Sequence, residues 1–368
     1  MAGPLTGRSF LRTVVLVFLA IAVLFAVDLF LAGVERRETR IEAARLFGQG
    51  RDLMQRGNKA EAIERIQDAL AIDRENHGYL RTLAQAQFEA GKTADAEATL
   101  NRLLETDSTD GLAALIMGRI LAKEGQFPEA VSYFRRAIFG HWSEDAAGNR
   151  LRVRFELIDL LAQRNSKEEL LAELLPVQDQ APLDLPMRMR LGRLFLLAGS
   201  PARAAAVFRG ILHDAPANAD AYAGLGETEF AGGNYRAAQR DFQTALQFAP
   251  GNEAAGQRLE VCNELLMLDP TMRGLSPQDR FQRSLKLVDL TLDQTKSCIG
   301  QNPSSQLQGL LDQAGKTLAA HVSAVHQSEA SESNLDLAEQ LWQVRRQECT
   351  PVPALDSPLA LVLARLAQ

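Results

Sequence analysis

Histidine, cysteine and the larger aromatic residues are scarce in this chain of 368 residues, which has five histidines, three cysteines, two tryptophans and four tyrosines. No Cys-x-x-Cys pair or Cys/His cluster is present to supply the four ligands of a zinc site. The motifs His-Glu-x-x-His and Gly-x-Ser-x-Gly are missing too, as is a glycine-rich dinucleotide loop. We therefore expect no metal, no cofactor and no catalytic residues. An enzyme whose site is assembled from distant residues is a remote alternative.

Dense positive charge is also missing. The chain has 40 lysines and arginines against 46 aspartates and glutamates, a formal net charge of −6. No block of basic residues could neutralise a run of phosphates, so we expect no nucleic acid among the partners. The apolar content of 46% is nevertheless enough to bury a large core.

What the chain has instead is a pattern that repeats every 34 residues. Turn glycines return at that interval as Gly57, Gly91 and Gly125, and again as Gly199 and Gly233. Small residues keep the same phase, and so do bulky ones. The small residues are Gly50, Ala84, Gly118, Gly192 and Gly226 before the turn, and Ala62, Ala96, Ala130, Ala204 and Ala238 after it; the bulky residues are Ile66, Leu100, Phe134, Leu174, Phe208 and Phe242. We expect small residues to face each other where two helices cross closely. Self-similarity at a fixed period is typical of stacked helical repeats.

This combination resembles the tetratricopeptide repeat (TPR) family. The resemblance covers residues 43–252 in six repeats, namely 43–76, 77–110, 111–144, 151–184, 185–218 and 219–252, with a short insertion at 145–150. The fourth repeat departs most, because Ile158 and Leu170 stand where small residues belong, while Asn165 takes the turn. We expect that repeat to be distorted. The resemblance implies an all-α fold, a right-handed α-solenoid of six helix pairs.

The resemblance also implies a binding surface. In TPR proteins the first helix of each repeat lines the concave face. Transferred to this sequence, the contact positions of that helix include Phe47, Arg51, Arg81, Phe88, Leu115, Arg119, Phe155, Met189, Arg193 and Leu196. Apolar side chains alternate there with guanidinium groups, which suits proteins or peptides with acidic segments. The alternative is that several of these side chains only pack between repeats.

The first forty residues predict a membrane anchor. After a tail of residues 1–12, an apolar run at 13–34 is interrupted only by Asp28 and is long enough to span a lipid bilayer. Its length and a poor cleavage site favour an uncleaved single-pass transmembrane helix over a signal peptide. Residues 35–42 form the juxtamembrane segment. We expect Asp28 to reach the headgroups, with a functional intramembrane acid as the alternative.

The charges beside this run disagree about its orientation. The arginines after Val34 outnumber Arg8 and Arg12 before it, which favours a cytoplasmic repeat domain. A short arginine-bearing tail ahead of the first apolar segment is, however, the usual layout of an anchor whose tail stays inside. We expect a bacterial inner-membrane protein with periplasmic repeats, and a cytoplasmic repeat domain stays open.

Residues 253–368 lose the 34-residue phase and form a C-terminal capping and helical region. A first helix is expected to cover the last repeat. Serine and proline at positions 276 and 277 mark the start of a second. We expect further helices over 307–325, 335–344 and 358–366, with a polar loop at 328–333.

Two of the three cysteines are placed at adjacent helix ends. Cys298 and Cys349 could form a disulfide that staples this region, and two reduced thiols are the alternative. Cys262 lies in an apolar helix and is expected to be a free core thiol.

These features predict a membrane-anchored protein–protein interaction scaffold that recruits or assembles partner proteins through the concave TPR face. The alternative is a permanent structural subunit of an envelope complex with no exchangeable ligand.

Overall fold

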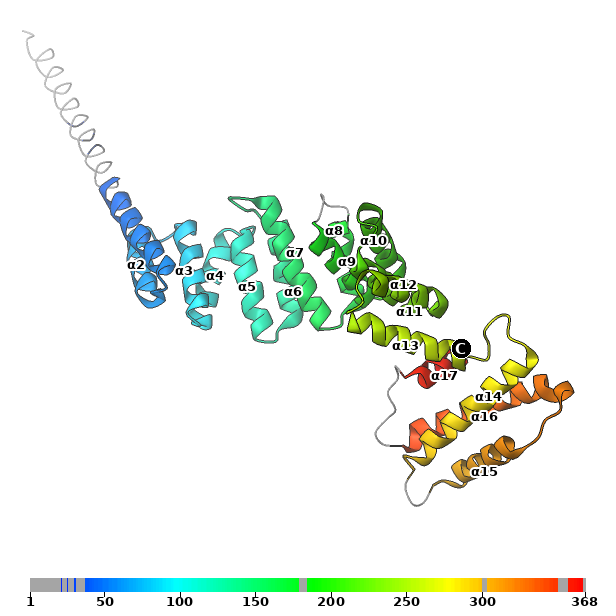
Figure 1. Cartoon of the computed structure of the whole chain (residues 1–368). Coiled ribbons are helices and arrows are strands. Elements are labelled where there is room, and N and C mark those ends of the chain that lie inside the picture. Colours follow the sequence, from blue (N-terminus) through cyan, green and yellow to red (C-terminus); the bar gives the residue numbers. More distant parts are fainter. Residues whose placement is uncertain are drawn as a thin grey trace, which may run out of the picture. The chain divides into compact units, whose positions relative to one another are not determined.

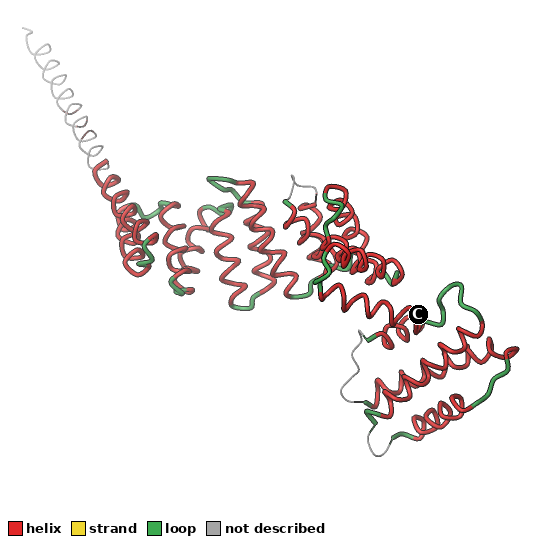
Figure 2. The backbone as a smooth tube through the Cα atoms, in the orientation of Figure 1, coloured by secondary structure: helices red, strands yellow, loops and turns green. Residues whose placement is uncertain are grey.

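The computed structural model describes residues 37–178, 184–299, 303–349 and 357–366, with the single positions 21, 25 and 30. Over these residues the chain is helical and contains no strand (Figures 1 and 2). The all-α expectation is therefore confirmed for this part of the chain. Backbone contacts divide the protein into two compact units, an N-terminal unit (Met1–Arg164) and a C-terminal unit (Asn165–Gln368).

The N-terminal unit is a stack of helices that each contact the next. Residues 37–55 are helical, and α2 (Lys59–Ile72), α3 (His77–Glu89), α4 (Thr93–Thr106), α5 (Gly111–Lys123), α6 (Phe127–Phe139) and α7 (Ala146–Gln163) follow. Asparagine and aspartate side chains begin the first helices of successive repeats. Asn76 accepts a hydrogen bond from the Tyr79 amide at 3.2 Å, and Asp110 accepts one from the Ala113 amide at 2.9 Å. These caps satisfy backbone donors that the first turn of a helix leaves open.

The C-terminal unit continues the pattern and then departs from it. Its repeat helices are α8 (Lys167–Gln178), α9 (Leu185–Leu197), α10 (Pro201–Asp214), α11 (Ala219–Ala231) and α12 (Tyr235–Phe248). Beyond them lie α13 (Glu253–Leu268), α14 (Pro277–Lys296), α15 (Ser305–Ala319), η1 (Ala324–His326), α16 (Gln327–Glu348) and α17 (Pro358–Leu366). As predicted, α13 packs on α12 and covers the last repeat.

The turns within the repeats adopt a backbone conformation that ordinary side chains rarely take. The values of φ are +83° at Gly57, +77° at Gly91, +80° at Gly125, +54° at Asn165, +71° at Gly199 and +75° at Gly233. Glycine adopts positive φ at no steric cost, and asparagine tolerates it better than most residues. The spacing of these residues in the sequence therefore has a direct backbone cause.

Close packing within a helix pair relies on one small and one bulky residue. An added Cβ atom at Gly192 would lie 2.6 Å from Phe208 Cζ, and one at Gly226 would lie 2.7 Å from Phe242 Cε1. The prediction that small residues mainly face small residues is therefore wrong for these two pairs. The glycine of the first helix instead makes room for the aromatic ring of the second, because the ring fills the space that a side chain would occupy.

The fourth repeat differs from its neighbours, and the predicted insertion explains part of the difference. Residues 146–150 of the insertion are helical, and its first residue, Asp145, caps α7 by accepting a hydrogen bond from the Gly148 amide at 3.2 Å. As a result α7 has 18 residues, whereas the first helices of the second, third, fifth and sixth repeats have 13. Pro176 lies inside α8.

Two boundaries predicted in the C-terminal region are wrong. The helix expected over 307–325 ends with α15 at Ala319, and the loop expected at 328–333 lies inside α16. Polar side chains near the start of α16 are buried, and other groups of the protein satisfy their hydrogen-bonding capacity. The Ser331 hydroxyl donates to the Gln327 carbonyl at 2.6 Å, and the Asn334 amide donates to the Ser284 hydroxyl at 2.9 Å.

Cys298 and Cys349 are joined by a disulfide, with their Cα atoms 5.5 Å apart. This bond ties the end of α14 to the end of α16, two helices that also pack along each other. Cys262 is a free, buried thiol in α13, and burial raises its pKa to about 11.

The predicted membrane span at 13–34 lies outside the described residues, apart from the single positions 21, 25 and 30. Among the helices that the structure describes, none is both long and apolar enough to cross a bilayer.

Candidate functional site: the first-helix surface

The candidate binding site consists of side chains on the first helices of the repeats, here called the first-helix surface. Its predicted members come from the helix over 37–55, from α3, α5 and α7 in the N-terminal unit, and from α9 in the C-terminal unit. In the structure these members fall into three groups, which differ in solvent exposure and in whether an acidic side chain of the protein already binds them.

The first group is apolar and buried. Leu115, Phe155 and Met189 are each less than a tenth exposed. Their burial means that they pack within the repeat stack and offer little area to a ligand in the free protein. For these three residues the packing alternative holds, because a first helix in a stack contacts helices on most of its circumference.

The second group consists of arginines that the protein's own acids already hold. Arg81 lies 3.3 Å from the buried carboxylate of Asp110. Arg119 on α5 makes two hydrogen bonds to Glu156 on α7, at 2.6 and 2.8 Å. This paired geometry is the strong form of an ion pair. It links two successive first helices and fixes their spacing on this surface.

The third group remains available to a partner. Arg51 and Arg193 are exposed, and neither guanidinium forms an ion pair within the described residues. Each has an apolar side chain one helical turn away, since Phe47 precedes Arg51 by four residues and Leu196 follows Arg193 by three. Both apolar side chains are half-buried, and so is Phe88 on α3.

The Phe47 side chain is held in place by a tyrosine that the sequence did not single out. The rings of Phe47 and Tyr79 stack with their centroids 4.4 Å apart. Burial raises the pKa of Tyr79, and the charge of Asp73 raises it further. Tyr79 is therefore neutral at ordinary pH and extends the aromatic surface beside Arg51.

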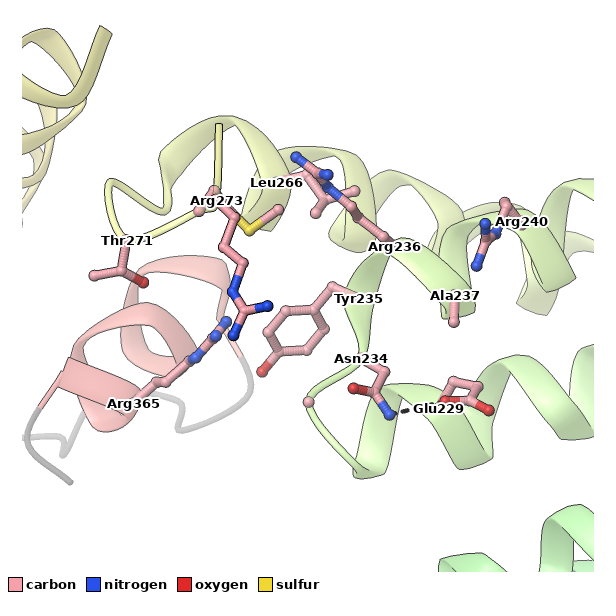
Figure 3. Close-up of a pocket in the computed structure, with 12 residues that line it drawn as sticks. Glu229, Asn234, Tyr235, Arg236, Ala237, Arg240, Leu266, Thr271, Arg273 and Arg365 are labelled. Atoms are coloured by element: carbon pink, nitrogen blue, oxygen red, sulfur yellow. Dashed lines mark hydrogen bonds between the residues drawn. The ribbon is translucent and has the colours of Figure 1, made fainter. Parts of the chain in front are cut away.

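Sequence reasoning also missed a cavity of about 590 Å³ in the C-terminal unit. It is lined by the amino end of α12, by the turn after α13 and by Arg365 of α17 (Figure 3). Four arginines line it, namely Arg236, Arg240, Arg273 and Arg365. No periodic signal could reveal this cavity, because Arg273 and Arg365 lie outside the repeats and meet Tyr235 only in the folded chain.

Two family models, both described as tetratricopeptide repeat, match the chain. The first matches residues 53–120 and 195–260, and the second matches residues 156–219. These segments include the turns at Gly57, Gly91, Asn165, Gly199 and Gly233. No curated protein matches the chain.

Several solved structures are similar to this chain at low sequence identity. YrrB, described as a TPR protein with an unusual peptide-binding site, is 19% identical over 53% of this chain and 97% of its own, with a TM-score of 0.42. The C-terminal part of a TPR repeat-containing protein from Cytophaga hutchinsonii is 14% identical over 84% of this chain and 97% of its own, with a TM-score of 0.43. PilW, a type IV pilus biogenesis factor, is 19% identical over 59% of this chain and 96% of its own, with a TM-score of 0.36. At these values nothing about a partner transfers to this chain.

Proposed function

Because this chain belongs to the tetratricopeptide repeat family, we propose that it is a membrane-anchored scaffold that binds acidic segments of partner proteins on its first-helix surface. The fold itself is that of a protein–protein interaction scaffold. Two arginines carry the proposal, Arg51 in the N-terminal unit and Arg193 in the C-terminal unit. Each forms no ion pair among the described residues and lies one helical turn from a half-buried apolar side chain.

An arginine beside an apolar contact suits a peptide that carries an acidic residue next to an apolar one. The guanidinium binds a carboxylate through two parallel hydrogen bonds, and the apolar side chain excludes water around them. The ion pair between Arg119 and Glu156 supports this function in another way, because it holds neighbouring first helices in place before a ligand arrives.

The test compares two double variants of the full-length chain. Arg51→Glu with Arg193→Glu should reduce capture of the most enriched partner from the native membrane fraction by about tenfold or more. Arg45→Glu with Arg203→Glu makes the same change in net charge at exposed positions outside the predicted contact set, and it should leave capture unchanged. Arg119 is kept, because a glutamate there would face Glu156 and disturb the fold. Equal capture by both variants would overturn the proposed surface.

The membrane anchor is part of the proposal and rests on the apolar run at 13–34. We place the repeats in the periplasm of a bacterial cell, and the disulfide between Cys298 and Cys349 supports this side because such bonds persist in oxidising compartments. Alkaline phosphatase fused after Gln368 should be active in cells, while a reporter that works only in the cytoplasm should be inactive there. The reverse pattern would place the repeats inside.

A further inference from the structure

We propose that the cavity at the end of α12, here called the arginine cavity, is a second binding site that takes the carboxylate of an acidic peptide segment. It lies in the C-terminal unit. The proposal is independent of the first-helix surface, because the arginine cavity could bind its ligand even if that surface bound nothing.

The cavity holds more positive charge than the protein itself neutralises. Of the four arginines that line it, Arg365 is the only one in an ion pair with a described residue, at 3.0 Å from the Asp269 carboxylate. Within the described residues, Arg236, Arg240 and Arg273 form no close ion pair, although the charge of Arg240 acts on the neighbouring carboxyl group of Asp241.

Two of the acids near the cavity are already engaged in hydrogen bonds. Asp269 is buried, and its second oxygen accepts hydrogen bonds from the Thr271 amide and hydroxyl, at 2.8 and 2.6 Å. Glu229, which lines the cavity, accepts from the Asn234 side chain at 2.9 Å and from Arg209 at 3.4 Å. The side chains of Arg236, Arg240 and Arg273 are exposed, so an external anion can reach their guanidinium groups.

Three donors converge on one side of the cavity. Figure 3 shows the guanidinium groups of Arg273 and Arg365 directed toward the same space beside the ring of Tyr235. Burial raises the pKa of Tyr235, which keeps its hydroxyl protonated and able to donate. Two guanidinium groups and one hydroxyl can satisfy both oxygens of a carboxylate.

The position of Tyr235 is fixed by packing. Its ring meets Phe230 edge to face, with the centroids 5.3 Å apart, and contacts the core formed by α13 to α17. Asp269 likewise fixes Arg365. Two of the three donors are therefore in place before a ligand binds, which lowers the entropic cost of binding.

The remaining lining favours a peptide over a free inorganic anion. Leu266, Met272 and Ala237 give the cavity an apolar surface, and its volume of about 590 Å³ exceeds what one small anion needs. An acidic residue followed by an apolar one matches both features.

The test measures the binding of a fluorescein-labelled hexapeptide of alternating glutamate and leucine, with amidated carboxyl end, to the full-length chain by anisotropy. A peptide with glutamine in place of glutamate is the ligand control. Arg273→Gln should weaken binding of the glutamate peptide about tenfold, and Tyr235→Phe should weaken it about threefold. Arg280→Gln removes an equal charge from an exposed position on α14 outside the cavity, and it should leave binding unchanged.

Several outcomes would overturn the proposal: no binding of the glutamate peptide, equal binding of the glutamine peptide, or equal affinity of the wild type and Arg273→Gln. Displacement of the peptide by inorganic phosphate but not by chloride at the same ionic strength would reassign the cavity to free anions and overturn the peptide as its ligand. Because the first-helix surface is proposed to bind the same kind of peptide, the comparison of Arg273 with Arg273→Gln is repeated in the Arg51→Glu, Arg193→Glu background, where Arg273→Gln should still weaken binding about tenfold. Failure of the first-helix surface is therefore distinguishable from failure of the cavity.

Discussion

At the scale of single residues, the fold depends on glycines that accommodate aromatic rings. Replacing Gly226 with alanine should lower the free energy of unfolding by about 1–3 kcal/mol, because the new Cβ atom would lie 2.7 Å from the Phe242 ring. Denaturant unfolding of the full-length chain gives the value. The matched control is Gly256→Ala in the first turn of α13, where an added Cβ atom meets nothing within 4 Å. That change should stabilise the protein by about 0.5–1 kcal/mol, as alanine does in a helix.

Equal unfolding curves for Gly226→Ala and the wild type would show that the ring moves aside without cost. If the clash is the cause, a second change of Phe242 to leucine should recover part of the lost stability, although the same change alone destabilises the core.

Asp241 on α12 is a half-buried carboxyl group that weakens the folded state at neutral pH. Burial raises its pKa to about 6, and the negative charge of Glu229 adds to the rise. An unfolded aspartate titrates near pH 3.9. Between about pH 4 and pH 6 the folded state therefore binds more protons than the unfolded state, so this group lowers stability as pH rises through that window.

Asp241→Asn should be more stable than the wild type above pH 6 by about 1 kcal/mol, after allowance for partial exposure. The gain should vanish below pH 4, and melting temperatures measured across this range test the slope. Asp293→Asn, at an exposed position on α14, should keep the wild-type pH profile. A gain at pH 7 that persists unchanged at pH 4 would contradict the assigned cause.

At the scale of helices, the disulfide is the strongest single constraint on the C-terminal region. It closes a loop over a sequence separation of 51 residues, which corresponds to about 4 kcal/mol in the chain-entropy description. Reductant should therefore lower the melting temperature of the wild type and leave that of the double variant Cys298→Ser with Cys349→Ser unchanged. Thiol labelling of the denatured wild type should find one free thiol before reduction and three after it. Three before reduction would refute the bond.

The helix boundaries show what the sequence can and cannot reveal. The 34-residue period and the turn glycines predict the repeat helices. Positive φ at Gly91 and Gly125 is a requirement of the local backbone that glycine meets, so the sequence alone reveals these turns. The first turns of α16, where a polar loop is expected, carry no such signal, because Asn334 is a polar residue that is buried and donates a hydrogen bond to Ser284 on α14. A hydrogen-bond partner 50 residues away in the sequence produces no local sequence pattern from which the contact could be predicted.

The candidate binding sites, like the helix boundaries, are predictable only where a local sequence pattern marks them. Arg51 and Arg193 were predicted from repeat position and are indeed exposed. Leu115 was predicted on the same ground and is buried, because repeat position does not say which side of a helix a neighbouring helix covers. The arginine cavity depends on residues separated by more than a hundred positions, and only the folded chain brings them together.

At the scale of the whole molecule, each repeat contacts mainly its neighbours, so a defect should stay local. Gly226→Ala should speed amide hydrogen exchange in α11 and α12 and leave the rates in α3 to α6 unchanged. Exchange followed by mass spectrometry of peptides tests this expectation. Faster exchange throughout both units would show that the chain unfolds as one cooperative body.

The ring of Phe208 has a consequence for how such a chain can evolve. It touches Gly192 in its own repeat and also Gly224 in the next, where an added Cβ atom would lie 2.5 Å from the ring. Recombination that places another repeat directly after the fifth, such as a copy of the third or of the fifth, would set this ring against a different neighbour. At the position of Gly224 the third repeat has Ile116 and the fifth has Arg190, and neither leaves room for it. The fifth and sixth repeats must therefore be inherited together, as a block of two.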